Sequence, residues 1–458
     1  MNQQFRCCDL DQPFLLPPSL QDWLPQHHLA RFVAEVVDQL DLSGILATYG
    51  RADGRGKRGY HPAMMVRLLL YGYAVGVRSS RKLEKASYDE VAFRYLAANQ
   101  HPDHDSLAAF RQQHLEALAG LFLQALRLCE KAGLVKLGQV AIDGSKIMAN
   151  ASRQQSRSYE RLSEKEKALA AEVERLLAEA AAADRREDDL FGKGKRGDEL
   201  PEELSTAEKQ LAKLRAAKQE LEREAQEKAK QAALEKQAQG NKPRDEAQKK
   251  RWQRAKNIPD SEAQGNLTDP ESRSMIDGCN KARVQGYNAQ IAVTAESQII
   301  VAQTVVTAEN DKQQLLPMTE QAQQNLGRKP DEVVADSGYW SEHSIATLAA
   351  PENAISVLVP PDGPKTMQSA ELPANAPRGP QAQQMRQRLK DPVERQRYQQ
   401  RSGTVEPVFA WIKERLGYRR FLLRGLTKVR GEWALICTVI NLRRLYRHHW
   451  LEHACFTS

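Results

Sequence analysis

The hydrophobic positions of the chain follow different patterns in successive parts of the sequence. Residues 20–130 carry apolar side chains at helical spacing, as in Ala30–Leu40 and Ala63–Val75, and this pattern predicts a region made of helices alone. Residues 160–189 and 203–238 are rich in Ala, Glu, Lys, Leu, Arg and Gln, which also favour helices. Short β-branched runs before and after these two stretches predict strands.

Five such runs predict the strands of one sheet. They are Leu137–Ser145, Gly286–Val293, Gln298–Val306, Glu332–Asp336 and Ala354–Pro361. Helices are predicted at Gln313–Leu326 and Ser341–Ala349, and from Pro392 the chain is predicted to be helical and basic. The segment Pro364–Asp391 is rich in Pro, Gln and Ala and predicts a loop. This order predicts a mixed α/β sheet that a helical insertion interrupts once.

The predicted insertion has the spacing of a coiled coil. Apolar positions step by four and three residues in the first half, at Leu169, Val173, Leu176, Ala180 and Ala183. The second half repeats the spacing at Leu211, Leu214, Lys218, Leu221 and Ala225. Such seams bury one helix against another. The glycines and the proline in Phe191–Pro201 predict a break between the two helices. Because both ends of the insertion must return to the same sheet, we expect the two helices to form an antiparallel hairpin.

The composition restricts the class of protein. Of 458 residues, 41% are hydrophobic and 28% are charged, which is the balance of a globular protein. The longest apolar runs are shorter than the roughly 18 residues that cross a bilayer, and the first residues lack the apolar region of a secretory signal. The six cysteines contain no CxxC pair, which argues against a zinc ribbon and fits a reducing cytoplasm.

The positive charge is concentrated in two segments. Residues 401–449 contain eleven Lys or Arg against three acids, and residues 51–94 contain ten against four. Separate basic segments of this kind indicate binding of a polyanion at two places. The alternative, a basic surface that only faces solvent, stays open at this point.

Acidic residues at the ends of predicted strands suggest metal chemistry. Asp143 and Asp336 each follow an apolar run, where a carboxylate is expensive to desolvate unless a cation pairs with it. Carboxylate oxygens suit Mg²⁺ or Mn²⁺. Glu406, at the start of a basic helix, is the candidate for a third carboxylate. Asp277 competes with these acids, and a single strand-end Asp is more often a turn or capping residue.

These residues resemble a known family. Asp143 in Ala-Ile-Asp-Gly-Ser-Lys, Asp336 in Val-Ala-Asp-Ser-Gly-Tyr-Trp and Glu406 in Val-Glu-Pro-Val-Phe are similar to the three acids of the DDE transposases of bacterial insertion sequences. The run Gly417–Gly425 and the later Asn441-Leu-Arg-Arg-Leu are similar to the C-terminus of that family. Residues 13 to 115, with Leu70-Tyr-Gly-Tyr and Phe93-Arg-Tyr-Leu, resemble its helical N-terminal domain.

The resemblance implies a ribonuclease H-like core that uses two Mg²⁺ ions, or Mn²⁺ in their place, to cleave transposon ends and transfer them into target DNA. The acids Asp143, Asp336 and Glu406 would be both the catalytic residues and the metal ligands. The Tyr-Arg-Glu-Lys signature of the superfamily maps to Tyr398, Arg401, Glu406 and Lys413, with four residues instead of the usual three between Arg and Glu. The residues expected to bind DNA are Tyr398, Arg401, Lys413, Arg419, Arg420 and Arg424.

The resemblance also implies an arrangement of domains and partners. We expect a helical DNA-binding domain at 1–130, a catalytic domain at 131–155 and 275–450, a helical insertion at 156–260 and a short tail at 451–458. The expected partners are terminal inverted repeats, target DNA and a second copy of the chain, in the bacterial cytoplasm at the nucleoid. Two alternatives remain: an inactive, domesticated transposase that only binds DNA, and a ribonuclease H-like nuclease without strand transfer.

Overall fold

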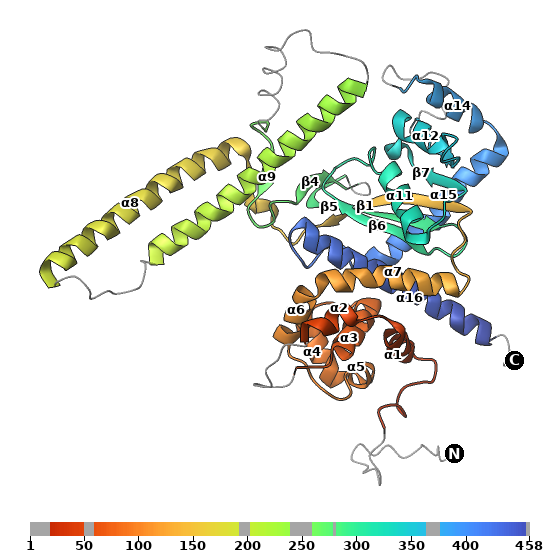
Figure 1. Cartoon of the computed structure of the whole chain (residues 1–458), viewed down its shortest axis with the longest axis horizontal. Coiled ribbons are helices and arrows are strands. Elements are labelled where there is room, and N and C mark those ends of the chain that lie inside the picture. Colours follow the sequence, from red (N-terminus) through yellow and green to blue (C-terminus); the bar gives the residue numbers. More distant parts are fainter. Residues whose placement is uncertain are drawn as a thin grey trace, which may run out of the picture.

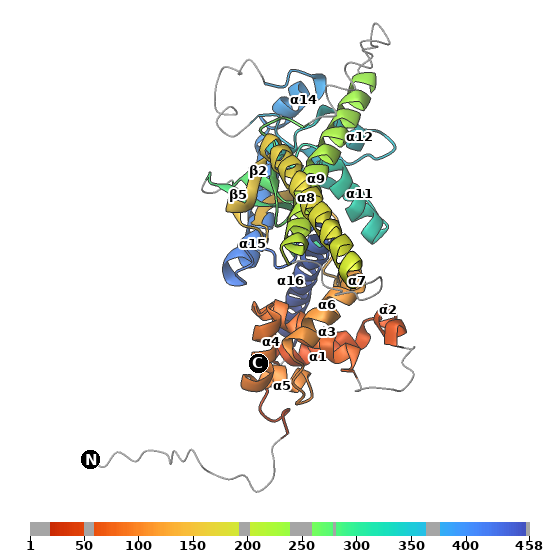
Figure 2. The same cartoon turned by 90° about the vertical axis from the view of Figure 1, so that its left-hand side faces the viewer.

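The computed structural model describes residues 19–49, 59–191, 202–238, 259–277, 281–362 and 376–454. A curled sheet flanked by helices occupies the middle of the molecule, a group of short helices lies at one end, and two long helices project to one side (Figure 1). The view turned by 90° shows the same arrangement, with the short helices below the sheet (Figure 2). Among the described residues, no helix combines the length and the apolar character that a membrane span requires.

The sheet is mixed, as predicted, and has six strands. They are β1 (Gln139–Met148), β4 (Arg273–Ile276), β5 (Arg283–Thr294), β6 (Ile300–Val306), β7 (Glu332–Ala335) and β8 (Ser356–Leu358). The strands lie in the order β4-β5-β1-β7-β8, and β6 also pairs with β5. β1 runs antiparallel to β5 and parallel to β7, which in turn runs parallel to β8. All five predicted strands are present, whereas the polar segment before the second of them had not predicted β4.

The central strand β1 is longer than predicted, and Asp143 is therefore not at its end. Pairing with β7 stops at Ile142, opposite Ala335, but antiparallel pairing with β5 continues from Asp143 to Met148. The prediction of a strand end was wrong because the apolar run stops at Ile142 while the backbone pairing does not. Asp143 instead marks the position at which β1 loses its parallel neighbour.

Helices cover both the sheet and its edge near β8. They are α11 (Leu315–Leu326), α12 (Glu342–Ala349), α14 (Pro380–Arg388), α15 (Pro392–Ala410), a π-helical turn (Trp411–Arg415) and α16 (Leu426–Ala454). The loop predicted for residues 364–391 is wrong at α14, since Pro380 occupies the first helical turn and Ala382 and Met385 are buried. Residues 364–375 of that segment lie outside the described part of the chain.

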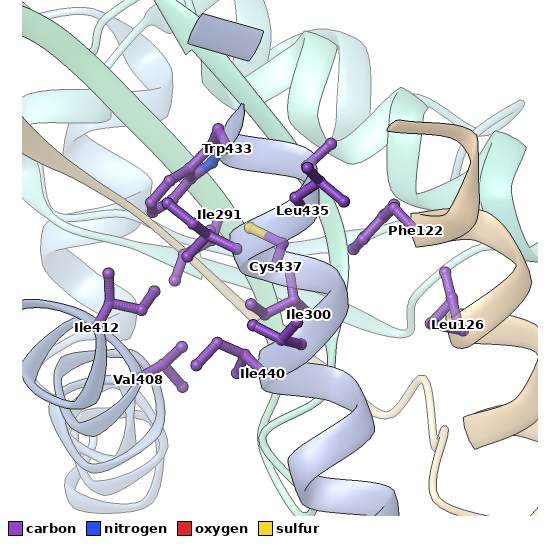
Figure 3. Packing of buried hydrophobic residues seen from close by; sticks show 14 of the residues in the cluster. Phe122, Leu126, Ile291, Ile300, Val408, Ile412, Trp433, Leu435, Cys437 and Ile440 are labelled. Carbon is purple, nitrogen blue, oxygen red and sulfur yellow. The ribbon is translucent and has the colours of Figure 1, made fainter. Parts of the chain in front are cut away.

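Helix α16 is the centre of the hydrophobic core. Its middle residues, among them Trp433, Leu435, Cys437 and Ile440, are buried, and Figure 3 shows them with the strand residues Ile291 and Ile300 and the α7 residue Phe122. A helix that is apolar on all sides must be covered on all sides. Asn441 binds the backbone of β6, because its side chain accepts from the Ile300 amide (2.9 Å) and donates to the Ile300 carbonyl (2.8 Å).

The N-terminal region is all helical, as predicted. Its helices are α1 (Leu29–Gln39), α2 (Ser43–Leu46), α3 (Pro62–Val75), α4 (Ser80–Asp89), α5 (Val91–Leu96), α6 (His104–Gln113) and α7 (Leu115–Lys131). The motif residues Tyr71 and Phe93 pack edge to face within it, with ring centroids 4.9 Å apart. One continuous cluster of buried side chains joins these helices to the sheet. The predicted boundary at residue 130 falls in the last turn of α7, which packs along α16.

A buried ion pair connects the N-terminal helices to the loop before α16. Arg78 donates to Glu432 (2.8 Å) and lies over the ring of Tyr418, 4.5 Å from its centroid. Glu432, which is fully buried, also accepts from the backbone amides of Leu422 and Leu423. We call this set of contacts the Arg78–Glu432 junction. It fixes the position of the basic loop Gly417–Gly425 relative to the N-terminal helices.

The predicted insertion forms two long helices that pack against each other in antiparallel directions. They are α8 (Tyr159–Phe191) and α9 (Glu202–Ala238). Near the sheet Tyr159 donates to Glu222 (2.7 Å), and farther out Glu166 pairs with Lys218 (2.8 Å). Still farther along, Val173 packs with Ala207 and Leu211, as two of the predicted seam positions require. The turn predicted at 191–201 lies almost entirely outside the described residues, and coiled-coil winding stays a prediction.

The two ends of the insertion meet at the sheet. β2 (Ser156–Ser158) and β3 (Gln264–Asn266) pair antiparallel and close the base of the hairpin. Arg273 on β4 pairs with Glu224 (2.6 Å) and Glu220 (3.1 Å) of α9. The expectation that the insertion returns to the point where it leaves is confirmed, although two short unpredicted strands make the closure.

Candidate active site

Asp143 and Asp336 come together at the middle of the sheet. β1 and β7 are parallel neighbours, and Ile142 pairs with Ala335, so the residues that follow these two lie side by side. The chain turns after β7 into a short 3₁₀ helix, Ser337–Tyr339, where the Asp336 carboxylate accepts from the Gly338 amide (2.9 Å). Two carboxylates from distant parts of the sequence therefore share one site.

The electrostatics of the pair reflect burial and mutual repulsion. Burial raises the pKa of Asp143 to about 6, the Arg401 guanidinium opposes this shift, and the Asp336 carboxylate adds to it. Burial likewise raises the pKa of Asp336, and Arg401 again opposes the rise. Desolvation disfavours a charged carboxylate, and a second carboxylate nearby disfavours it further. Arg401 therefore offsets only part of the cost of burying the two carboxylates.

Arg401 is the cation that faces the pair. Its Nη1 atom lies 3.2 Å from Oδ2 of Asp143, and α15 carries it to the sheet. Tyr398, one turn earlier on α15, lies beside it: burial raises the pKa of the Tyr398 phenol, and Arg401 opposes that rise. The structure thus brings two signature residues, Tyr398 and Arg401, to the acid pair.

Glu406 does not join the two aspartates. Its side chain is exposed on α15, and no three His, Cys, Asp or Glu side chains in the described ranges are grouped so that they could hold a metal ion. The reason is helical geometry: five residues after Arg401, at about 100° per residue, Glu406 points roughly 140° away from it. The extra residue between Arg and Glu in the sequence signature has this direct consequence.

The pair Asp143 and Asp336 fits a divalent cation by its chemistry. Both groups offer hard oxygen donors of the kind that Mg²⁺ and Mn²⁺ take. The Asp336 charge raises the pKa of Asp143, and a cation bound by both carboxylates would relieve this repulsion. The structure supplies two of the three expected ligands at one place.

The other predicted DNA-binding residues lie near the basic loop. Lys413 is half-buried in the π-helical turn, and Arg419, Arg420 and Arg424 are exposed. The loop runs beside the end of β1, because the Met148 amide donates to the Arg419 carbonyl (3.0 Å) and the Phe421 amide donates to the Met148 carbonyl (2.9 Å). The strand that carries Asp143 therefore also positions these arginines.

Several polar residues beside the acids were missed by the sequence analysis. Lys146 on β1, Gln290 on β5 and Asp311 before α11 are all close to the pair, and the Asp311 charge raises the pKa of both aspartates. Gln290 gave a signal, since it and Asn288 are the two polar residues within the run Tyr287–Val293 and share one face of the strand. Asp311 lies in a polar loop, where no pattern in the sequence marks it as a residue of the site.

Comparison with known families agrees with this geometry. Residues 18–113 match the model of the family described as "Transposase domain (DUF772)". Residues 248–442 match the "Transposase DDE domain", and this range includes β7 with Asp336, and α15. Neither the curated proteins nor the solved structures gave a match to this chain.

Proposed function

The chain belongs to the DDE transposases of insertion sequences, metal-dependent enzymes of DNA cleavage and transposition, and we propose that it moves its element by a cut-and-paste reaction. The observation that carries the proposal is the meeting of Asp143 and Asp336 on neighbouring parallel strands. The strand order β6-β5-β1-β7-β8, with β5 antiparallel and β7 and β8 parallel to β1, is compatible with a ribonuclease H-like core.

In this proposal Asp143 and Asp336 hold Mg²⁺, or Mn²⁺ in its place, and Glu406 completes a second ion site. Two such ions, when bound, activate the attacking oxygen and stabilise the leaving oxygen of an in-line phosphoryl transfer. For Glu406 to contribute, α15 has to turn locally between Arg401 and Glu406. The π-helical turn at Trp411–Arg415 shows that the helix is irregular just after Glu406, and such turns are often found at functional sites.

Arg401 has two alternative anionic partners in the proposed reaction. In the structure it pairs with Asp143. A phosphate of the DNA end is a stronger partner, since guanidinium binds phosphate through two parallel hydrogen bonds. When Arg401 donates to DNA, Asp143 loses its counter-charge and is available to a cation, so arrival of DNA and loading of metal favour each other.

Phosphate contacts place the DNA, while base contacts select it. We assign the phosphate contacts to Lys413 and to Arg419, Arg420 and Arg424 of the loop beside β1. Recognition of the terminal repeats is assigned to the N-terminal helices. The Arg78–Glu432 junction supports this division, because it links those helices to the arginine loop through buried contacts.

DNA binding is expected to depend steeply on salt, with a log–log slope of about −0.9 for each phosphate contact. Arg419→Ala and Arg424→Ala should each make the slope shallower by about 0.9, because each removes one contact. Fluorescence anisotropy of end DNA over a series of salt concentrations measures this. Arg223→Ala, on the hairpin, is the matched control and should leave the slope unchanged. Slopes that are the same for all three variants would contradict the assignment of the loop.

Excision tests the cut-and-paste reaction itself. Purified protein with Mg²⁺ should release the element as a linear fragment from a plasmid that carries both ends. A plasmid with a single end should release none and should be cut slowly, because we propose that a homodimer pairs two ends before cleavage. Gel analysis of both plasmids is the measurement. Equal cleavage of the two plasmids would contradict paired ends, and nicked products alone would contradict excision.

A further inference from the structure

A buried polar cluster lies beside the acid pair. The Asp311 Oδ1 atom accepts hydrogen bonds from Asn288 Nδ2 and Gln290 Nε2, both at 2.6 Å. Its Oδ2 atom lies 3.8 Å from the ammonium of Lys146, whose side chain is only 12% exposed. Asn288 and Gln290 are themselves fully buried on β5. Three donors from two strands thus converge on one carboxylate.

Glycine at position 144 makes room for this cluster. Gly144 directly follows Asp143 and pairs with Gln290 across the two strands. A Cβ atom at this position would lie 2.1 Å from Gln290 Nε2 and 2.9 Å from Asp311 Oδ1, which is closer than such atoms can approach. The absence of a side chain therefore lets Gln290 and Asp311 lie directly against β1, next to Asp143.

The cluster is also connected to Asp336. Tyr339, which lies three residues after Asp336 in the same 3₁₀ turn, is fully buried, and its hydroxyl donates to Gln290 Oε1. The amide of Gln290 is thus held at both ends, by Asp311 on one side and by Tyr339 on the other. Tyr339 in turn anchors the turn that begins at Asp336.

We propose that Asp311 is a positioning residue of the active site: its carboxylate orients Gln290, and through Gln290 and Tyr339 it keeps Asp336 beside Asp143 for a divalent cation. The proposal rests on the proposed function, and it assigns Asp311 no direct bond to the metal. Groups that orient metal ligands in this way commonly change metal affinity 10- to 100-fold when they are altered.

The chemistry of the cluster requires a carboxylate. An ionised Asp only accepts hydrogen bonds, whereas Asn presents two donors at one end of its amide. Asn at position 311 can accept from the amides of Asn288 and Gln290 only by turning its own NH₂ group toward the Lys146 ammonium. Asp311→Asn therefore keeps the size of the side chain but places donor against donor.

The test measures Mn²⁺ affinity of the full-length chain by calorimetry, beside cleavage of end DNA. Asp311→Asn should weaken Mn²⁺ binding about 10-fold or more and lower kcat of cleavage, while KM for end DNA stays near that of the unaltered chain. Tyr339→Phe, which removes only the hydroxyl, should also weaken Mn²⁺ binding. If Asp311→Asn does not fold, the Mn²⁺ affinity of Tyr339→Phe tests the proposal instead. Glu320→Gln is the matched control, with the same loss of charge at an exposed position on α11, and should change neither quantity.

The outcomes separate this inference from the proposed function. If the unaltered chain binds no Mn²⁺ and cuts no DNA, the proposed function fails. If the unaltered chain does both, and Asp311→Asn and Tyr339→Phe bind Mn²⁺ as tightly as it does, the positioning role of Asp311 is overturned while the function stands. Equal losses for Asp311→Asn and Glu320→Gln would show a general effect of charge and would also overturn it.

Discussion

Replacing Asp143 by Asn, or Asp336 by Asn, is expected to lower the rate of DNA cleavage by at least about a thousandfold, while DNA binding stays within about twofold. Metal assistance supplies several kcal/mol of transition-state stabilisation, and each 1.36 kcal/mol corresponds to a factor of about ten in rate. Asn keeps the shape of the side chain but lacks the charge that holds the cation. Single-turnover cleavage of end DNA in Mg²⁺, with binding measured separately in Ca²⁺, gives both quantities.

A matched control exists on the same strand. Asp331 is exposed at the opposite end of β7 from Asp336, and Asp331→Asn should cleave at the rate of the unaltered chain. Glu406→Gln is expected to behave like the two Asp variants, because the proposed second ion site needs that carboxylate. If Asp143→Asn, Asp336→Asn or Glu406→Gln still cleaves DNA, the residue altered in that variant does not belong to the site.

Breaking the Arg78–Glu432 junction should destabilise the fold strongly, because both side chains are largely buried. Glu432→Gln is expected to lower the free energy of unfolding by about 3–5 kcal/mol, since it leaves the Arg78 guanidinium buried without its counter-charge. It also weakens the acceptor of the Leu422 and Leu423 amides. Chemical denaturation followed by far-UV circular dichroism measures the change.

Two further variants test the cause of that loss. Glu414→Gln, at an exposed ion pair with Arg419, should cost less than about 1 kcal/mol, as exposed pairs usually do. Arg78→Met combined with Glu432→Gln should recover part of the stability, because no uncompensated charge then remains buried. If Glu432→Gln costs no more than Glu414→Gln, the junction is not a stabilising contact.

Much of the fold could be predicted from local patterns. The β-branched runs that became β6 and β7 are apolar because these strands are largely buried, and the breaks before and after them are marked by turn residues. The hairpin was predictable from its seam, since Val173 and Leu211 had to be covered by a partner. Asp143 and Asp336 stood out because each ended an apolar run.

The parts that could not be predicted depend on pairing between distant segments. β1 extends past Asp143 only because β5 offers a partner as far as Gly286. Whether Glu406 faces the acids depends on where α15 docks, and the sequence signature does not contain that information. Asp311 reaches the site from a loop, through contacts with Asn288 and Gln290 that no local pattern encodes.

Strand joining tests the central claim most directly, because it also separates a transposase from a nuclease or an inactive DNA-binding protein. A duplex oligonucleotide that ends in the 3′-hydroxyl of the element is incubated with the full-length chain, Mg²⁺ and a supercoiled target plasmid. The account predicts that the oligonucleotide becomes covalently joined to the plasmid through that 3′ end, only when Mg²⁺ is present, and not with Asp336→Asn. Cleavage without any joined product, or joining that Asp336→Asn leaves intact, would contradict it.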